Sequence, residues 1–241
     1  MTAGSAASVP AWCTLVRADN PSPMTLEGTN TYVLRAPGAL AAVVVDPGPL
    51  DEAHLAAVAA LGPVGLILLT HGHPDHAEGA HLFQDMTGAA MAAVEPRLVV
   101  DAEPIRGGAT FTDVGGLTIR TVATPGPPSD SVCFVVEDEV PALLTGDTIL
   151  GRGSTVVAHP DGQLAPYLDS LARLRELGPM LLLPGHGPVR SDASALAAEY
   201  LAHREQRLSQ VRAAVAAGDR TARDVVRRVY VDVDESLWAA A

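Results

Sequence analysis

The chain lacks lysine: all sixteen basic residues among its 241 are arginines, against 28 acidic residues. The formal charge of −12 argues against a whole-surface polyanion-binding protein, because such proteins usually carry a basic face. The two cysteines, Cys13 and Cys133, are too few for a disulfide framework, so we expect a reducing, cytoplasmic compartment. No apolar run approaches the ~18 residues of a membrane span, and residues 1–10 lack a signal-peptide pattern. We therefore expect no membrane partner.

Aromatic residues make up only 4% of the chain and hydrophobic residues 48%, so we expect a core of small aliphatic side chains. Strand and helix patterns alternate up to about residue 192, and helix patterns alone follow. We divide the chain into a main domain, 1–192, and a C-terminal helical unit, 193–241. The main strands are expected at 41–45, 64–70, 131–136, 142–145, 155–158 and 180–183, and the main helices at 51–61 and 166–177.

A cluster of imidazole and carboxylate groups follows the aliphatic strand expected at residues 64–70. Its members are His71, His73, Asp75 and His76. His71 and His73 are two positions apart, so they cannot share a helical face and must project from a loop or strand. Imidazoles and carboxylates are ligands of zinc and similar divalent ions. The cluster predicts a metal site, because otherwise four polar groups would have gathered beside an apolar strand by chance.

Two further candidate ligands, Asp147 and His186, follow other expected strands in loops that contain glycine. Strand-end loops along one edge of a sheet are where α/β architectures place sites. Each residue alone is more often a turn residue, but the cluster at 71–76 favours ligation by both. Asp46 ends the strand at 41–45 and is either a turn residue or a partner that orients a ligand.

These motifs resemble those of the metallo-β-lactamase fold hydrolases. Residues 70–76 resemble the T-H-x-H-x-D-H signature, Asp147 with its preceding glycine the bridging-aspartate motif, and residues 184–187 the final histidine motif. Residues 24–32 and 200–204 are similar to the beta-lactamase-like protein 2 group. The resemblance implies an α/β (α+β) fold, a four-layer αββα sandwich, with a short C-terminal helical appendage like an incomplete winged helix. We expect residues 1–192 to fold alone if those helices cover no large apolar patch.

The resemblance also implies zinc as cofactor. The implied ligands are His71, His73, Asp75, His76, Asp147 and His186.

One departure from the family lies at residues 124–128, which read Thr-Pro-Gly-Pro-Pro instead of T-P-G-H-T. Pro127 stands in place of the third histidine of the first metal site, and its ring has no lone pair to donate. The first site keeps His71, His73 and a share of Asp147. The second site keeps all its ligands, which are Asp75, His76, Asp147 and His186. We expect one tightly held ion and a second, weaker one, with other divalent metals as alternatives to zinc. Ser129 or Asp130 would replace the missing ligand if the loop shifts.

The resemblance implies a hydrolase that uses a metal-activated water, since bound zinc lowers the pKa of water to about 7. Asp75 is the candidate for moving the proton of that water, His186 for steadying the leaving side, and Asn30 for donating to a substrate oxygen. The closer resemblance implies a single-stranded RNA substrate, and the wider family implies a small-molecule ester or thioester. The alternative is a non-catalytic metal- or ligand-binding protein of the same fold. A homodimer is compatible with both.

Seven arginines follow residue 203 and suggest a basic strip. Such a strip either follows an RNA backbone, with a strong salt dependence, or forms a solvated helix face paired with acids; the second interpretation is favoured. The seven are Arg204, Arg207, Arg212, Arg220, Arg223, Arg227 and Arg228.

Overall fold

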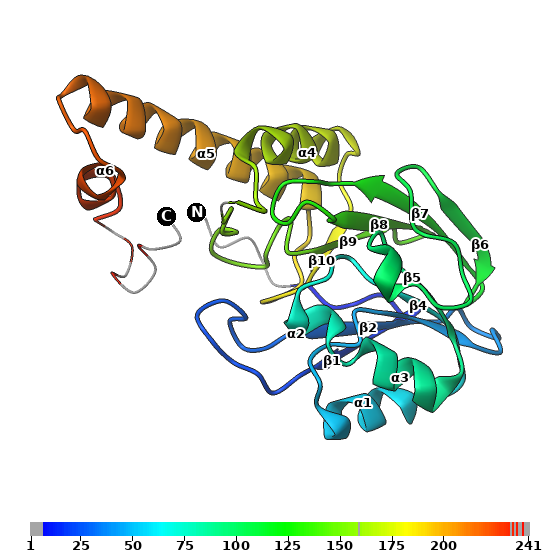
Figure 1. Ribbon diagram of the computed structural model, residues 1–241. Helices are drawn as coiled ribbons and strands as arrows, with labels where there is room; N and C mark the ends of the chain where they lie inside the picture. Colours follow the sequence, from blue (N-terminus) through cyan, green and yellow to red (C-terminus); the bar gives the residue numbers. More distant parts are fainter. Residues whose placement is uncertain (1–6, 159, 232, 234, 236–237, 239–241) are drawn as a thin grey trace.

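A computed structural model describes residues 7–158, 160–231, 233, 235 and 238 and shows two five-stranded sheets packed face to face (Figure 1). The first sheet has the order β1(Cys13–Arg17), β2(Asn30–Leu34), β3(Ala42–Val45), β4(Val64–Leu68), β5(Ala90–Ala92). The second has the order β10(Leu181–Pro184), β9(Ala142–Gly146), β8(Val132–Glu137), β7(Leu117–Ala123), β6(Thr110–Val114). Both sheets are mixed, because β3–β4, β4–β5 and β9–β10 are parallel pairs and the other pairs are antiparallel.

Helices cover the outer face of each sheet (Figure 1). The first sheet is covered by α1(Glu52–Ala59) and α3(Ala80–Thr87), and the short α2(Pro74–Ala77) leads into α3. The second sheet is covered by α4(Leu164–Glu176) and the first half of α5(Ala193–Ala216), whose second half extends away from the body to α6(Ala222–Val229). Pro96–Leu98 form a single 3-10 turn. The predicted four-layer αββα sandwich is confirmed.

The alternation of side chains along the strands explains the layers. Val43 and Val45 pack between the two sheets, whereas Val44 points to the helices over the first sheet. In β4, Leu68 likewise lies between the sheets and Ile67 lies under the helices. Because successive strand residues face opposite sides, a continuous aliphatic run is buried on both faces. The strand expected at residues 64–70 is such a run.

The strand predicted at residues 155–158 is wrong, because the structure shows an irregular segment there. Arg204 donates a hydrogen bond to the backbone carbonyl of Thr155, and the Thr155 hydroxyl donates to the backbone carbonyl of Asp147. Side-chain hydrogen bonds therefore hold this segment, in place of pairing with a neighbouring strand. Conversely, β1 was not predicted. It is an edge strand with only its first residue, Cys13, buried, so its sequence carries a weak apolar pattern.

The first half of α5 belongs to the packed body. Asp192 caps the helix by accepting from the backbone N–H of Ala195, at 2.9 Å. Leu196, Ala197 and Tyr200 then pack in one apolar cluster with the core residues of α4 and β8. The domain boundary near residue 192 stays a prediction. Among the described helices, none combines the length and apolar composition needed to cross a bilayer.

Candidate metal centre

The predicted ligands and Asp46 gather at one edge of the sandwich, in the segments that follow four strands. Asp46 follows β3, the cluster at 71–76 follows β4, Asp147 follows β9, and His186 follows β10. The close approach of two loops explains Gly146, whose φ is +48°: a Cβ at this position would lie 2.4 Å from the Thr70 hydroxyl oxygen. Only glycine fits both this conformation and this space.

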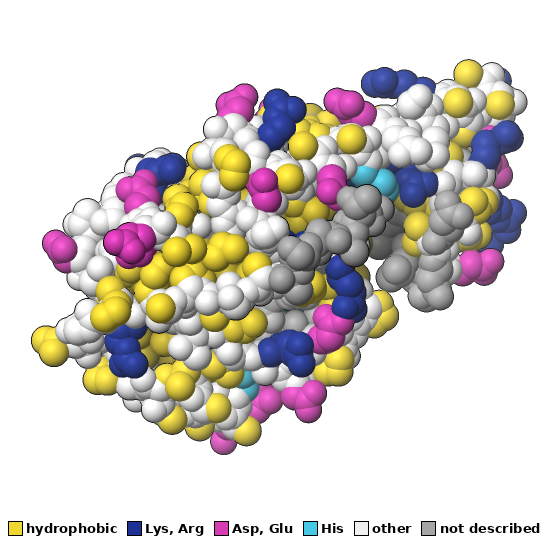
Figure 2. Space-filling view, turned by 180° about the vertical axis from the view of Figure 1, so that it is seen from behind, with side chains coloured by type: hydrophobic (Ala, Val, Ile, Leu, Met, Phe, Trp, Pro, Cys, Tyr) yellow, Lys and Arg dark blue, Asp and Glu magenta, His cyan; other side chains and the backbone are white. Residues whose placement is uncertain are grey.

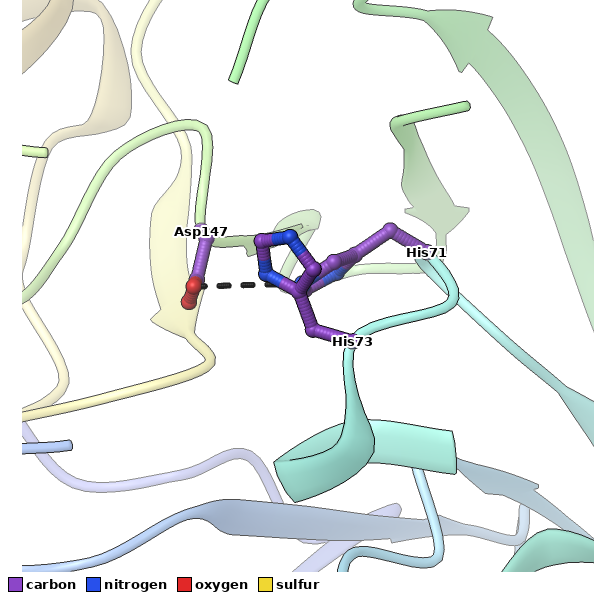
Figure 3. A group of neighbouring side chains, drawn as sticks. All are labelled: His71, His73 and Asp147. Atoms are coloured by element: carbon purple, nitrogen blue, oxygen red, sulfur yellow. Dashed lines mark ion pairs between the residues drawn. The ribbon is translucent and has the colours of Figure 1, made fainter. Parts of the chain in front are cut away.

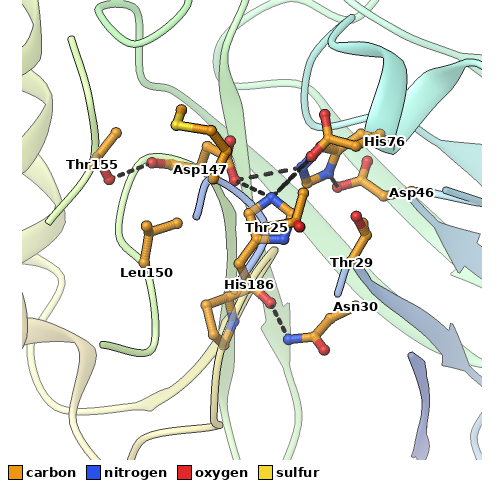
Figure 4. A network of polar contacts seen from close by, with 12 residues as sticks. Thr25, Thr29, Asn30, Asp46, His76, Asp147, Leu150, Thr155 and His186 are labelled. Carbon is orange, nitrogen blue, oxygen red and sulfur yellow. Dashed lines mark hydrogen bonds and ion pairs between the residues drawn. The ribbon is translucent and has the colours of Figure 1, made fainter. Parts of the chain in front are cut away.

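Four candidate ligand residues form a compact set: Asp75, His76, Asp147 and His186, of which Figure 4 labels the last three. The Nε2 atom of His186 lies 3.0 Å from Asp75 Oδ2, 3.2 Å from Asp147 Oδ1 and 3.2 Å from His76 Nε2. His76 Nε2 lies 3.4 Å from Asp147 Oδ1 and 3.5 Å from Asp75 Oδ2. Ligand atoms about 2.0–2.1 Å from a tetrahedral zinc ion stand about 3.3 Å apart. The spacing therefore fits one such ion.

A second set brings together His71, His73 and Asp147 (Figure 3). One potential ligand atom from each residue lies within 4.8 Å of the others, and His71 Nε2 is 3.8 Å from Asp147 Oδ2. His71 Nε2 is among the buried polar atoms without a hydrogen-bond partner. Such an atom is costly unless something binds it, so its orientation into the shared space fits a metal site.

Asp46 braces the ligand segment that follows β4. Its Oδ1 accepts from the backbone N–H of Thr70 at 2.8 Å, and its Oδ2 accepts from the Thr70 hydroxyl at 2.7 Å and pairs with His76 Nδ1 at 2.8 Å. A carboxylate on Nδ1 fixes the tautomer that leaves Nε2 free for a metal. This is the orienting position expected for Asp46. Sequence reasoning assigned no role to Thr70, whose hydroxyl also lies 3.0 Å from His71 Nδ1.

The protonation equilibria of the site favour cation binding. Burial and the neighbouring charge of His76 lower the pKa of His71 to about 3, so its imidazole is neutral and keeps a lone pair. Burial alone would lower the pKa of His76, but the carboxylates of Asp147 and Asp46 raise it well above its usual value. Although burial opposes ionisation of Asp75, the hydrogen bond with His186 lowers its pKa. The centre therefore holds ionised carboxylates around a proton that a metal ion can replace.

The prediction that Asn30 donates to a substrate oxygen does not fit the structure. Its side-chain amide donates to the carbonyl oxygens of Pro184 and Gly187, both at 2.9 Å, so both hydrogens are engaged. Its backbone N–H also donates to Gly185 O, at 2.8 Å. Asn30 therefore braces the loop that carries His186.

Pro127 lines the same cavity as His73 and Asp147. Neither alternative ligand takes its place in this conformation. Asp130 Oδ2 accepts from the backbone N–H of Gly72 at 2.8 Å, and the Ser129 hydroxyl donates to Asp161 at 2.7 Å. Among the described residues, the first set consequently has three members and the second, counting Asp147, has four.

A cavity of about 360 Å³ opens beside both sets. Metal-ligand candidates His73 and Asp147 form part of its floor, and Arg152, paired with Glu27, is the one arginine among its described lining residues. Its apolar lining consists of Pro23, Met24, Leu26, Pro127, Pro128, Leu150, Val156 and Ala158. The cavity suits a largely uncharged group placed next to the metal centre.

Three of the seven arginines of the basic strip are tied into the protein. Arg204 donates to the carbonyl of Thr155, Arg207 to that of Val229, and Arg228 pairs with Asp219. Figure 2 shows basic side chains next to acidic ones at the end of the molecule formed by α5 and α6. These contacts agree with the interpretation as a helix face rather than a backbone-binding strip.

Comparison with known proteins identifies the family. The sequence profile of the metallo-beta-lactamase superfamily matches residues 24–186. Lactamase-like protein vrtG of Penicillium aethiopicum is 36% identical, over 93% of this chain and 75% of its own length. The atrochrysone carboxyl ACP thioesterase of Aspergillus chevalieri is 34% identical, over 92% of this chain and 74% of its own length. The beta-lactamase-like protein 2 homolog of Drosophila melanogaster is 31% identical, over 92% and 81%.

Solved structures agree with this assignment. A metallo-beta-lactamase family protein from Thermus thermophilus superimposes with a TM-score of 0.76 at 26% identity, covering 92% of this chain and 89% of that protein. A beta-lactamase domain protein from Burkholderia ambifaria gives a TM-score of 0.78 at 25% identity, covering 99% and 85%. Together with the motifs and the sandwich, these matches show that the chain belongs to the metallo-beta-lactamase superfamily of hydrolases.

Proposed function

We propose that the chain is a zinc-dependent hydrolase of esters or thioesters with an apolar acyl group. The observation that carries this proposal is the spacing of 3.0–3.5 Å among the ligand atoms of Asp75, His76, Asp147 and His186. These residues hold the tight ion. His71 and His73 share Asp147 with them and hold a weaker one, because Pro127 contributes no ligand.

When bound, zinc activates water as a nucleophile at neutral pH and polarises the substrate carbonyl. The protein supplies the proton transfer and the orientation. Asp75 is ionised at neutral pH and its side chain is partly exposed, so its carboxylate orients the attacking water and accepts its proton. His186 steadies the leaving side, and Asp46 keeps His76 in the tautomer with Nε2 free.

The lining of the cavity favours an acyl substrate. Eight of its described lining residues are apolar, and its arginine is already paired with Glu27. An apolar acyl group gains free energy by leaving water for such a surface, at roughly 25 cal/mol per Å² of buried apolar area. A relative that covers 92% of this chain is named as a thioesterase.

Single-stranded RNA, the alternative substrate, requires cationic groups along its phosphates. Three of the seven arginines of the basic strip are engaged within the protein, as described above, and the cavity itself is lined by only one arginine among its described residues. We therefore favour the thioester.

The test is release of free thiol from acyl thioesters, measured beside cleavage of a single-stranded RNA. We expect thioester hydrolysis that a chelator abolishes and added zinc restores. Asp75→Asn should abolish it, whereas Asp85→Asn, the same change at an exposed position of α3, should leave it unchanged. Cleavage of RNA without thioester hydrolysis would overturn the substrate class, and full activity after complete metal removal would overturn the mechanism.

A further inference from the structure

The wall of the cavity between Leu150 and Ala158 is held by side chains of α5. This segment forms no strand, and residues 152–154, which include Gly153, are exposed. The Tyr200 hydroxyl oxygen accepts from the backbone N–H of Leu150, at 3.1 Å. Because an irregular segment with glycine has little shape of its own, such anchors determine where the wall lies.

Arg204 supplies a second anchor one helical turn after Tyr200. Its half-buried guanidinium donates to the carbonyl oxygen of Thr155 and lies 5.5 Å from the centre of the Tyr167 ring. Tyr167, from α4, in turn donates to Thr148 O at 2.9 Å. A planar guanidinium over an aromatic ring is held in one orientation, so its hydrogen bond is directed.

Thr155 connects this anchor to the metal centre. Its side chain is buried, and its hydroxyl donates to the backbone carbonyl of Asp147 at 2.7 Å (Figure 4). Asp147 is the residue shared by both candidate ligand sets. A continuous series of contacts therefore runs from Arg204 of α5 through Thr155 to Asp147.

We propose that Arg204 and Tyr200 are positioning residues, through which α5 sets both the wall of the acyl cavity and the placement of Asp147. This inference rests on the proposed function for its substrate class. It gives the C-terminal helical unit a defined part in the reaction without contact with the substrate. A displaced wall weakens the fit of a long acyl group, and a displaced Asp147 weakens both metal sites.

The experiment compares Arg204→Gln and Tyr200→Phe with Arg212→Gln, which changes an exposed arginine of the same helix. Three measurements are made: steady-state kinetics (KM and kcat) with a short and a long acyl thioester, zinc affinity by competition with a chromophoric chelator, and hydrogen exchange at the Leu150 amide. Tyr200→Phe removes only the hydroxyl, so it tests the anchor with the ring retained. Arg204→Lys tests whether a conservative donor restores function.

For Arg204→Gln we expect a roughly tenfold rise in KM for the long thioester, a smaller change in kcat, and weaker zinc binding. Arg204→Lys should reverse part of the rise in KM and restore part of the lost zinc affinity. Tyr200→Phe should speed exchange at Leu150, because that amide loses its acceptor. Arg212→Gln should match the unaltered protein.

Folded Arg204→Gln and Tyr200→Phe proteins with the KM and zinc affinity of Arg212→Gln would overturn the proposal. If even the unaltered protein hydrolyses no thioester, the proposed function fails. Zinc affinity and exchange at Leu150 still decide the positioning role in that case, since neither requires turnover.

Discussion

Replacing Asp46 by asparagine tests the orienting role of this residue at a single atom. The carboxylate takes part in three hydrogen bonds, with the Thr70 N–H, the Thr70 hydroxyl and His76 Nδ1, at 2.7–2.8 Å. An amide offers one oxygen and one NH₂ group, so either the Thr70 N–H or His76 Nδ1 then faces another donor. If the NH₂ group of the asparagine faces His76 Nδ1, the His76 ring must carry its proton on Nε2, the atom that faces Asp75, Asp147 and His186.

Loss of such a hydrogen bond typically costs 10–100-fold in metal affinity, which corresponds to about 1.4–2.7 kcal/mol. We expect Asp46→Asn to weaken zinc binding by this factor, measured by competition with a chromophoric chelator. Asp85→Asn makes the same charge change at an exposed position and serves as the control. A folded Asp46→Asn protein with unchanged zinc affinity would refute the assignment of Asp46 as the group that fixes the tautomer of His76.

Three other predictions concern the metal centre and the helical unit. Pro127→His should raise zinc content from close to one ion per chain towards two, as counted by mass spectrometry; an unchanged count would contradict the missing-ligand explanation. Zinc affinity should rise with pH, because Asp147 and Asp46 raise the pKa of His76 and the ion must displace that proton; affinity independent of pH would contradict this. Ending the chain after residue 192 should lower the melting temperature sharply, because buried Tyr200 and its neighbours are removed from the apolar cluster with α4; an unchanged calorimetric melt would show that α5 is dispensable.

The sequence predicts the sandwich well because its strands are separated by unambiguous turns and its aliphatic runs can be buried only between layers. Gly88 illustrates this: it ends α3 in the left-handed conformation expected of a terminating glycine. The segment at 155–158 shows the limit. Its valines favour a strand. Two hydrogen bonds fix it as a loop instead: Arg204, which is distant in sequence, donates to the Thr155 carbonyl, and the Thr155 hydroxyl donates to the backbone carbonyl of Asp147.

The candidate ligands could be predicted because imidazole and carboxylate groups at strand ends form a recognisable pattern. The surrounding residues could not. Asn30 is engaged by carbonyl groups more than 150 residues away, and Thr70 and Thr155 act through single hydroxyl groups. No local pattern distinguishes such residues from ordinary strand or turn residues, because their partners are set by tertiary packing.

Metal content is the most direct test of the central claim that Asp75, His76, Asp147 and His186 hold the tight ion. The measurement is the number of zinc ions per chain, by mass spectrometry, in protein purified without added zinc, beside a His76→Ala variant. We expect close to one ion in the unaltered chain and none in the variant. An unchanged count in His76→Ala, or two tightly held ions in the unaltered chain, would contradict it.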